Sequence, residues 1–237
     1  RWSLDVRAIA LLDRVGPHRL TARIKQAGGD LILPKDETPG LAMGLGGVGI
    51  TLTDLVRLYI GFPRLGTTLP LRERMEDAQD ETSQRRLMDA TAAWHIGNVL
   101  MGTPPPENGV HNRIAFKTGT SYGYRDAWSV GFDGRYTMGV WVGRPDGAPV
   151  PGLLGRTAAA PILFDAFART GKIPLGLPAA PRGTLVAATA MLPLPLKRFR
   201  PVGELFRNVD DRAPKIHFPL NGSRLDLMTE GEGQSLR

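Results

Sequence analysis

A run with strand periodicity, residues 113–143, constrains the fold of this chain more than any other feature. It contains "RIAFKTG", then "DAWSVGFD", then "RYTMGVWVG". Asp133 and Gly134 separate the last two segments. An Asp-Gly pair between strand-like segments is the strongest short-range sequence signal for a β-hairpin. We therefore predict an antiparallel hairpin here, preceded by one further strand.

Helical patterns flank this run. Five segments have apolar residues at helical spacing: 6–15, 19–28, 53–62, 81–101 and 156–170. Thr51 and Asp54 fit a capping box that opens the third helix, and Gly102 with the prolines after it closes the fourth. Pro161 is expected in the first turn of the last helix or at a kink. The glycine-rich segment 40–49 predicts a loop close to other backbone. Helices packed on an antiparallel sheet make an α+β fold.

Proline-rich segments after residue 172 mark a change of organisation. We predict an extended connector over 173–212 that lies partly on the surface of the preceding domain. The following "KIHFPLNGSRLDLM" predicts two short strands around an Asn-Gly turn. The predicted domains are a main domain over 1–172, the connector, and the start of a small β domain over 213–237.

Composition excludes several classes of function. The sequence has no cysteine, which excludes disulfides, thiolate metal sites and a cysteine nucleophile. A net charge of +7 is compatible with an anionic partner, but the arginines are scattered and no nucleic-acid motif is present, so we predict no nucleic-acid binding. The histidines lack paired ligand spacing, and we predict no metal and no cofactor. No apolar run reaches the ~20 residues that cross a bilayer.

Lys117 is unusual because a lysine within a strand core is disfavoured unless it is paired or faces a cleft. Gly119 removes a side chain where another backbone can approach closely. Thr118 and Thr120 are two apart, so on a regular strand they point to one face and Lys117 to the other. The tetrapeptide alone favours an edge-strand lysine that opposes aggregation. The alternative is a strand edge that pairs with a peptide and binds its carboxylate through the two hydroxyls.

The surroundings of Lys117 change this balance. "KTGT" is followed by "SYGYRDAWSVGF" and "MGVWVGRPDG"; "GLGGVGITLTDLVRLYIGF" (44–62) precedes them, and "APKIHFPLNGSRLDL" (213–227) follows. In this order the stretches resemble the transpeptidase domain of the penicillin-binding proteins, specifically the class 1C bifunctional cell-wall synthases. The resemblance implies a β-lactamase/transpeptidase-like antiparallel sheet flanked by helices, followed by a truncated small all-β, Ig-like domain.

The resemblance also implies a reaction and roles for the strand. In the family, the serine of an S-x-x-K motif attacks the penultimate D-Ala carbonyl of a peptidoglycan stem peptide, and an amine of a neighbouring stem takes the acyl group. By resemblance, Lys117 is the lysine of the K-[ST]-G motif, and Thr118 and Thr120 bind the substrate carboxylate. Gly119 and Ser121 line the same substrate-binding strand, and the Thr120 N–H forms half of an oxyanion hole. The implied ligands are D-Ala-D-Ala stem peptides and β-lactam inhibitors.

Ser3-Leu4-Asp5 stands where the family's S-x-N motif is expected. By resemblance, Ser3 and Asp5 are catalytic residues. Aspartate keeps an acceptor oxygen but loses the amide donor and adds a negative charge. That charge can form an ion pair with the active-site lysines, or it can weaken substrate orientation. The residues alone favour another interpretation, in which Ser3 caps the first helix.

The family nucleophile is absent, because no serine in this sequence is followed by a lysine three positions later. We therefore expect a fragment that is inactive alone, with the S-x-x-K helix, a glycosyltransferase domain and a membrane anchor upstream. The intact protein would act at the periplasmic face of the bacterial inner membrane. A rival hypothesis is a degenerate, non-catalytic homologue that scaffolds wall synthesis or binds stem peptides, which Asp5 favours. Two more candidates are a basic binding module and a carboxypeptidase or β-lactamase of the same superfamily.

Overall fold

The computed structural model describes residues 5–34, 37–72, 74, 76, 83–187 and 191–193. The chain divides into one compact unit over Arg1–Thr184 and a second over Leu185–Arg237. The helices and strands described below belong to the first unit. The predicted β domain over 213–237, with its Ig-like fold, lies outside the described residues, as does most of the connector beyond residue 187.

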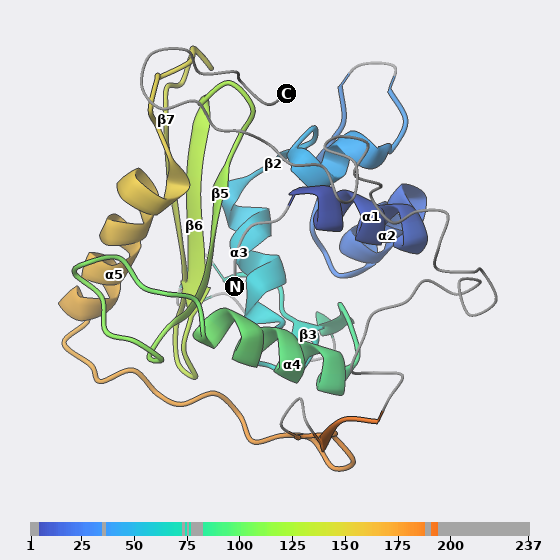
Figure 1. Ribbon diagram of the computed structural model, residues 1–237, viewed down its shortest axis with the longest axis vertical. Helices are drawn as coiled ribbons and strands as arrows, with labels where there is room; N and C mark the ends of the chain where they lie inside the picture. The colour runs from blue at the N-terminus through green and yellow to red at the C-terminus, as the bar shows by residue number, and fades with distance from the viewer. Residues whose placement is uncertain are drawn as a thin grey trace, which may run out of the picture. The chain divides into compact units, whose positions relative to one another are not determined.

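A three-stranded antiparallel sheet is the largest sheet among the described residues, and α5 (Ala160–Arg169) lies beside it (Figure 1). Its strands are β5 (Ala115–Thr120), β6 (Asp126–Phe132) and β7 (Thr137–Gly143), in that order. This confirms the predicted hairpin and the strand before it.

Asp133 shapes the hairpin turn, and it is almost fully buried. Its Oδ1 accepts hydrogen bonds from two backbone N–H groups of the turn, at 2.7 and 2.6 Å. Its Oδ2 accepts one from the Leu175 N–H at 3.0 Å, while the Gly134 N–H donates to the Leu175 carbonyl at 2.8 Å. These bonds attach Leu175, near the start of the predicted connector, to the hairpin turn.

One face of the sheet is covered by a helix that follows it in sequence. It begins as a π-helical turn, η3 (Gly155–Ala159), and continues as α5 (Ala160–Arg169). Pro161 lies in the first turn of α5, where its missing N–H costs no helical hydrogen bond. A buried apolar cluster joins this helix to the sheet, and its members are Ile114, Phe116, Ala160, Leu163, Phe164 and Phe167.

Helix α3 (Leu52–Ile60) packs against the other face of the sheet. A Cβ on Gly139 of β7 would lie 2.6 Å from the Val56 side chain, so the helix approaches the strand at a glycine. On the same face of the sheet, Phe132 stacks on Phe62, with 5.6 Å between the ring centroids. These contacts place apolar layers on both faces of the sheet.

Helix α4 (Ala90–Met101) packs against β5 and begins later than the pattern over 81–101 predicted. Asp89 caps it by accepting a hydrogen bond from the Thr91 N–H at 2.8 Å. The residues before the cap form β4 (Arg85–Arg86), which pairs with β3 (Thr67–Thr68). Strand pairing thus overrides the helical pattern at 85–86. The helix ends at Gly102, as predicted.

The N-terminal part is mainly helical. Its elements are α1 (Asp5–Val15), α2 (Pro17–Gln26), β1 (Leu31–Ile32), η1 (Leu41–Leu45) and β2 (Gly49–Ile50). The prediction that 40–49 is only a loop is wrong, because it contains a short 3₁₀ helix and part of a strand pair. The close approach to other backbone predicted for its glycines does occur: a Cβ on Gly47 would lie 3.0 Å from the Ala42 carbonyl oxygen, and one on Gly49 would lie 3.2 Å from the Ile32 Cβ.

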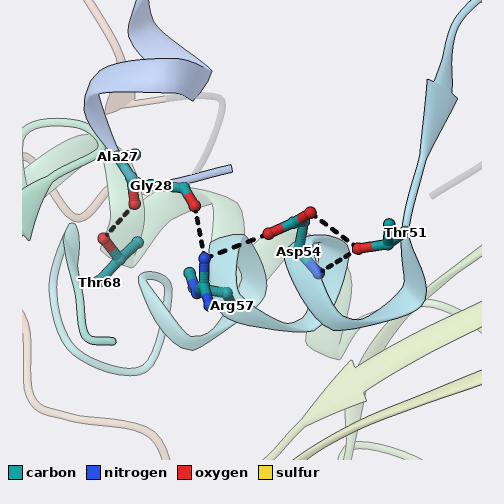
Figure 2. Close-up of polar contacts among 6 residues, drawn as sticks. All are labelled: Ala27, Gly28, Thr51, Asp54, Arg57 and Thr68. Carbon is teal, nitrogen blue, oxygen red and sulfur yellow. Dashed lines mark hydrogen bonds and ion pairs between the residues drawn. The ribbon is translucent and has the colours of Figure 1, made fainter. Parts of the chain in front are cut away.

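The predicted cap of α3 is present (Figure 2). The Thr51 hydroxyl accepts a hydrogen bond from the Asp54 N–H at 3.0 Å. The second half differs from a capping box, because the Thr51 hydroxyl donates to the Asp54 carboxylate at 2.8 Å. Asp54 also forms an ion pair with Arg57, at 3.2 Å.

Two further hydrogen bonds in Figure 2 connect the end of α2 to the rest of the unit. The Arg57 Nη1 donates to the Gly28 carbonyl at 2.8 Å. The Thr68 hydroxyl donates to the Ala27 carbonyl at 2.7 Å, and Thr68 is almost fully buried. Both bonds satisfy carbonyls at a helix C-terminus that have no partner within the helix. They hold α2 against α3 and β3.

Candidate active site

Strand β5, which carries the K-T-G sequence, changes from buried to exposed along its length. Ala115 and Phe116 have no exposed surface, Lys117 to Gly119 are half-buried, and Thr120 is exposed. Within the part of the chain that the structure describes, β5 pairs with β6 alone and is an edge strand. An edge strand presents backbone N–H and C=O groups that can pair with an extended peptide.

The two sides of β5 have different surroundings. Phe116 packs against Phe164 of α5, with 5.0 Å between ring centroids, so the alternation of side chains places Thr118 and Thr120 on the α5 and η3 face. Lys117 lies opposite Val130 in register and therefore points to the α3 face. The lysine side chain and the two hydroxyls thus lie on opposite faces of the sheet, as predicted for a regular strand.

The hydroxyl of Thr120 is held by the following helix. It accepts a hydrogen bond from the Gly155 N–H, at 3.0 Å, where η3 begins. A hydroxyl that accepts in this way still has its own proton to donate, for example to a carboxylate. The bond from Gly155 therefore orients the Thr120 hydroxyl and leaves its proton available for another hydrogen bond.

Another backbone does approach Gly119 closely, but the glycine that makes this possible is Gly155. A Cβ on Gly119 would meet the Trp128 side chain only at 3.6 Å, which is an ordinary contact. A Cβ on Gly155, in contrast, would lie 2.3 Å from the Gly119 carbonyl oxygen and 2.6 Å from that of Trp128. Gly155 lets the start of η3 lie directly on the backbones of β5 and β6.

Ser121 closes the loop between β5 and β6. Its hydroxyl accepts a hydrogen bond from the Asp126 N–H at 2.8 Å, and its own N–H donates to the Asp126 carbonyl at 3.0 Å. Tyr124 within the loop has a φ of 56°, which is uncommon for a residue other than glycine. The two bonds made by Ser121 fix the ends of this strained loop.

The ammonium of Lys117 donates a hydrogen bond to the Thr118 carbonyl. Ser3 lies outside the described residues. Asp5 is the first residue of α1, and its side chain lies outside the described part. The catalytic roles predicted for Ser3, Asp5 and Lys117 therefore stay predictions. The same holds for the predicted roles of Thr118, Gly119, Thr120 and Ser121.

Sequence reasoning missed a group at the exposed end of the sheet. Trp128 lies opposite Trp141 in register, and the Trp141 indole N–H donates to the Asp126 carboxylate at 2.8 Å. A two-residue Asp133-Gly134 turn would pair Trp128 with residue 139, whereas Phe132 actually lies opposite Thr137, so the sequence did not indicate the Trp128–Trp141 pair. The hydrogen bond to Asp126 had no sequence signal.

Neither a metal site nor a membrane span is found among the described residues. In those residues, no group of three or more His, Cys, Asp or Glu side chains is placed to hold a metal ion. No helix among them has the length and apolar character needed to cross a membrane.

Comparison with known sequences gives several relatives, although no family model matches. The chain is 41% identical to penicillin-binding protein 1C of Escherichia coli over 165 residues, which are 68% of this chain and 21% of that protein. It is 27% identical to penicillin-binding protein 4 of Bacillus subtilis over 60% of this chain and 25% of that protein. The chain thus spans between a fifth and a quarter of these relatives.

Solved structures share the fold. Penicillin-binding protein 1A of Haemophilus influenzae matches with a TM-score of 0.58 and 16% identity, over 76% of this chain and 35% of that one. The PonA1 protein of Mycobacterium tuberculosis, solved in complex with penicillin V, matches with a TM-score of 0.59 and 19% identity, over 75% of this chain and 56% of that one. Helices flanking an antiparallel sheet, the predicted class, are therefore confirmed.

Proposed function

Because the chain belongs to the penicillin-binding proteins, we propose that it forms one wall of the active site of a serine D,D-transpeptidase in peptidoglycan synthesis. The enzyme cross-links stem peptides through an acyl-enzyme. The observation that carries the proposal is the K-T-G sequence on the half-buried part of an edge strand. That position combines a cation, two hydroxyls and the backbone groups of a strand edge.

The donor peptide lies along β5 with its terminal carboxylate at Thr118 and Thr120. The positive charge of Lys117 lowers the free energy of that carboxylate and of the oxyanion formed during acyl transfer. The Thr120 N–H supplies one of the two oxyanion donors. Ser3 transfers a proton to or from the leaving and attacking groups, and Asp5 orients the substrate through its oxygens.

The attacking serine belongs to an S-x-x-K motif that this sequence does not contain. The chain alone is therefore inactive, and the complete enzyme also carries a glycosyltransferase and a membrane anchor. It works at the periplasmic face of the inner membrane, and β-lactams inhibit it by acylating the missing serine.

A binding experiment with the 237-residue chain tests whether it forms part of a peptide-binding site. Nα,Nε-diacetyl-L-Lys-D-Ala-D-Ala should bind, while the same peptide with an L-Ala-L-Ala end should not. Lys117→Met should weaken binding about tenfold, because it removes the positive charge that attracts the peptide carboxylate, and a tenfold change in affinity corresponds to about 1.4 kcal/mol. Lys172→Met, which removes an exposed lysine after α5, is the matched control and should leave the affinity unchanged. Equal binding of both peptides would contradict the proposal.

Labelling with a fluorescent penicillin tests the missing nucleophile. The chain should form no covalent adduct that survives denaturing electrophoresis. A longer gene product that contains both this sequence and an S-x-x-K motif should be labelled, and Lys117→Met should slow its labelling.

The aspartate in Ser3-Leu4-Asp5 favours a second candidate, a non-catalytic homologue that binds stem peptides or scaffolds wall synthesis. The two candidates predict different behaviour of the longer gene product. If that product binds the D-Ala-D-Ala peptide but is not labelled by penicillin, and Asp5→Asn restores labelling, the non-catalytic homologue is the correct candidate.

A further inference from the structure

A row of aromatic side chains crosses the exposed end of the sheet, next to the strand that carries Lys117. Trp128 of β6 lies between Gly119 of β5 and Trp141 of β7 in register. The two indole rings are 6.4 Å apart and inclined by 56°. Trp128 is half-buried, whereas 36% of Trp141 is exposed. Trp128, Trp141 and the neighbouring Asp126 are called the aromatic shelf below.

Asp126 gives the aromatic shelf a negative charge. Its Oδ1 accepts the Trp141 indole N–H at 2.8 Å in an exposed position. Gly143 faces Asp126 in register, and a Cβ there would lie 2.6 Å from Cζ2 of the Trp141 ring. The absence of that side chain is what lets the indole fold back to the carboxylate. An ionised carboxylate has about four lone-pair sites, so Asp126 can accept from a ligand as well.

The aromatic shelf lies on the same face of the sheet as Lys117. Lys117 is opposite Val130, and Trp128 is two residues from Val130 on the same strand, so both side chains point to the α3 face. Two residues along a strand correspond to roughly 7 Å. The shelf therefore continues the Lys117 face toward the loop between β5 and β6.

The chemistry of the aromatic shelf favours a cation. The face of an indole ring attracts positive charge more strongly than any other side-chain ring, and a carboxylate beside it adds Coulomb attraction. An anion would be repelled, and a purely apolar ligand would desolvate Asp126 without pairing it.

We propose that the aromatic shelf binds the primary ammonium group of a peptide lying along β5, on a residue that precedes the D-Ala-D-Ala end. The inference rests on the proposed function. A peptide antiparallel to β5, with its carboxylate at Thr118 and Thr120, runs so that its preceding residues lie beyond Thr120. That direction leads to the loop whose ends are joined by Ser121 and Asp126.

Two peptides that differ only in one charge test the inference on the 237-residue chain. They are Nα-acetyl-L-Lys-D-Ala-D-Ala, with a free side-chain ammonium, and the Nα,Nε-diacetyl form. Tryptophan fluorescence follows the titration, because the aromatic shelf contains two of the chain's four tryptophans. We expect the free-ammonium peptide to bind about fivefold more tightly, and this preference to shrink as salt is added.

Variants locate the ammonium. Asp126→Asn keeps an oxygen for the Trp141 N–H but removes the charge, so the preference should fall below about twofold while the affinity for the diacetyl peptide stays the same. Trp141→Leu should reduce both the preference and the fluorescence change. Asp146→Asn is the matched control, because Asp146 is an exposed aspartate paired with Arg144, and it should leave the fivefold preference intact.

The outcomes separate the inference from its premise. Equal affinity of the wild-type chain for the two peptides would overturn the inference and leave the proposed function standing, because both peptides carry the D-Ala-D-Ala end. A preference that persists in Asp126→Asn would also overturn it. If neither peptide binds, both the inference and the proposed function are rejected.

Discussion

Near the hairpin turn of the β5–β7 sheet, phenylalanine side chains are sealed from water, and at the other end of the sheet other aromatic side chains are open to it. Phe116 and Phe132, near the turn, have no exposed surface, whereas 96% of Tyr122 and 36% of Trp141 are exposed at the far end. Burial of apolar area contributes about 25 cal/mol per Å². The stabilising burial is therefore concentrated at the turn end, and this leaves the other end to present polar groups and indoles.

The means of holding each end also differ. At the turn end, apolar side chains pack from both faces, and the buried Asp133 ties the turn to the connector. At the open end, hydrogen bonds between backbone and hydroxyl groups fix the positions of Thr120 and Ser121. Side chains that are held by hydrogen bonds and are still accessible can meet a ligand, which buried phenylalanines cannot do.

The largest loss of stability is expected for Phe116→Ala. Phe116 fills the space between β5 and α5 and has no exposed surface, so its removal should lower the free energy of unfolding by about 3–5 kcal/mol. Urea unfolding measures the change. Tyr122→Ala, at the open end, is the control and should shift the free energy by less than about 0.5 kcal/mol. Similar losses in both variants would break the proposed division between the two ends.

Gly155→Ala tests whether the open end depends on backbone contact. The new Cβ would lie 2.3 Å from the Gly119 carbonyl oxygen, and no flexible side chain can move aside to relieve this overlap. We expect a loss of about 3 kcal/mol in the free energy of unfolding. Binding of the D-Ala-D-Ala peptide should weaken as well, because the Gly155 N–H no longer orients the Thr120 hydroxyl.

Gly176→Ala is the matched control, since a Cβ at Gly176 would meet no atom within 4 Å. It should change neither stability nor peptide affinity. If Gly155→Ala proves as mild as this control, η3 does not hold the strand, and the fixed position of Thr120 needs another cause.

The predictable part of the fold follows from local chemistry. Alternating apolar residues around Asp133 and Gly134 were enough to predict β6 and β7, and the Thr51 and Gly102 signals located the start of α3 and the end of α4. The K-T-G sequence directed attention to β5. These signals act within a few residues, so a single sequence contains them.

The features that were missed arise from contacts between distant segments. The start of α4 was predicted too early because the pairing of β4 with β3, across 17 residues between Thr68 and Arg85, is invisible in a helical pattern. Gly155 precedes a helix without any local sign that it presses on the Gly119 carbonyl. The bond between Trp141 and Asp126 likewise depends on the space over Gly143, which only the assembled sheet reveals.

The smallest predicted effect is a pH dependence at the sealed end. Tyr59 packs near Phe62 and Phe132, and burial raises the pKa of its hydroxyl from 10.0 to about 12. The unfolded chain therefore loses this proton first, so the stabilisation is complete below pH 10 and is lost as the pH rises toward 12. The loss of unfolding free energy at pH 11 is about 1.4 kcal/mol.

Urea unfolding at about pH 9 and about pH 11 should show this loss in the wild-type chain and not in Tyr59→Phe. The control, Tyr122→Phe, changes a hydroxyl that is already in water, so it should behave as the wild type. If Tyr122→Phe abolished the pH dependence and Tyr59→Phe did not, the turn end would not be the sealed one.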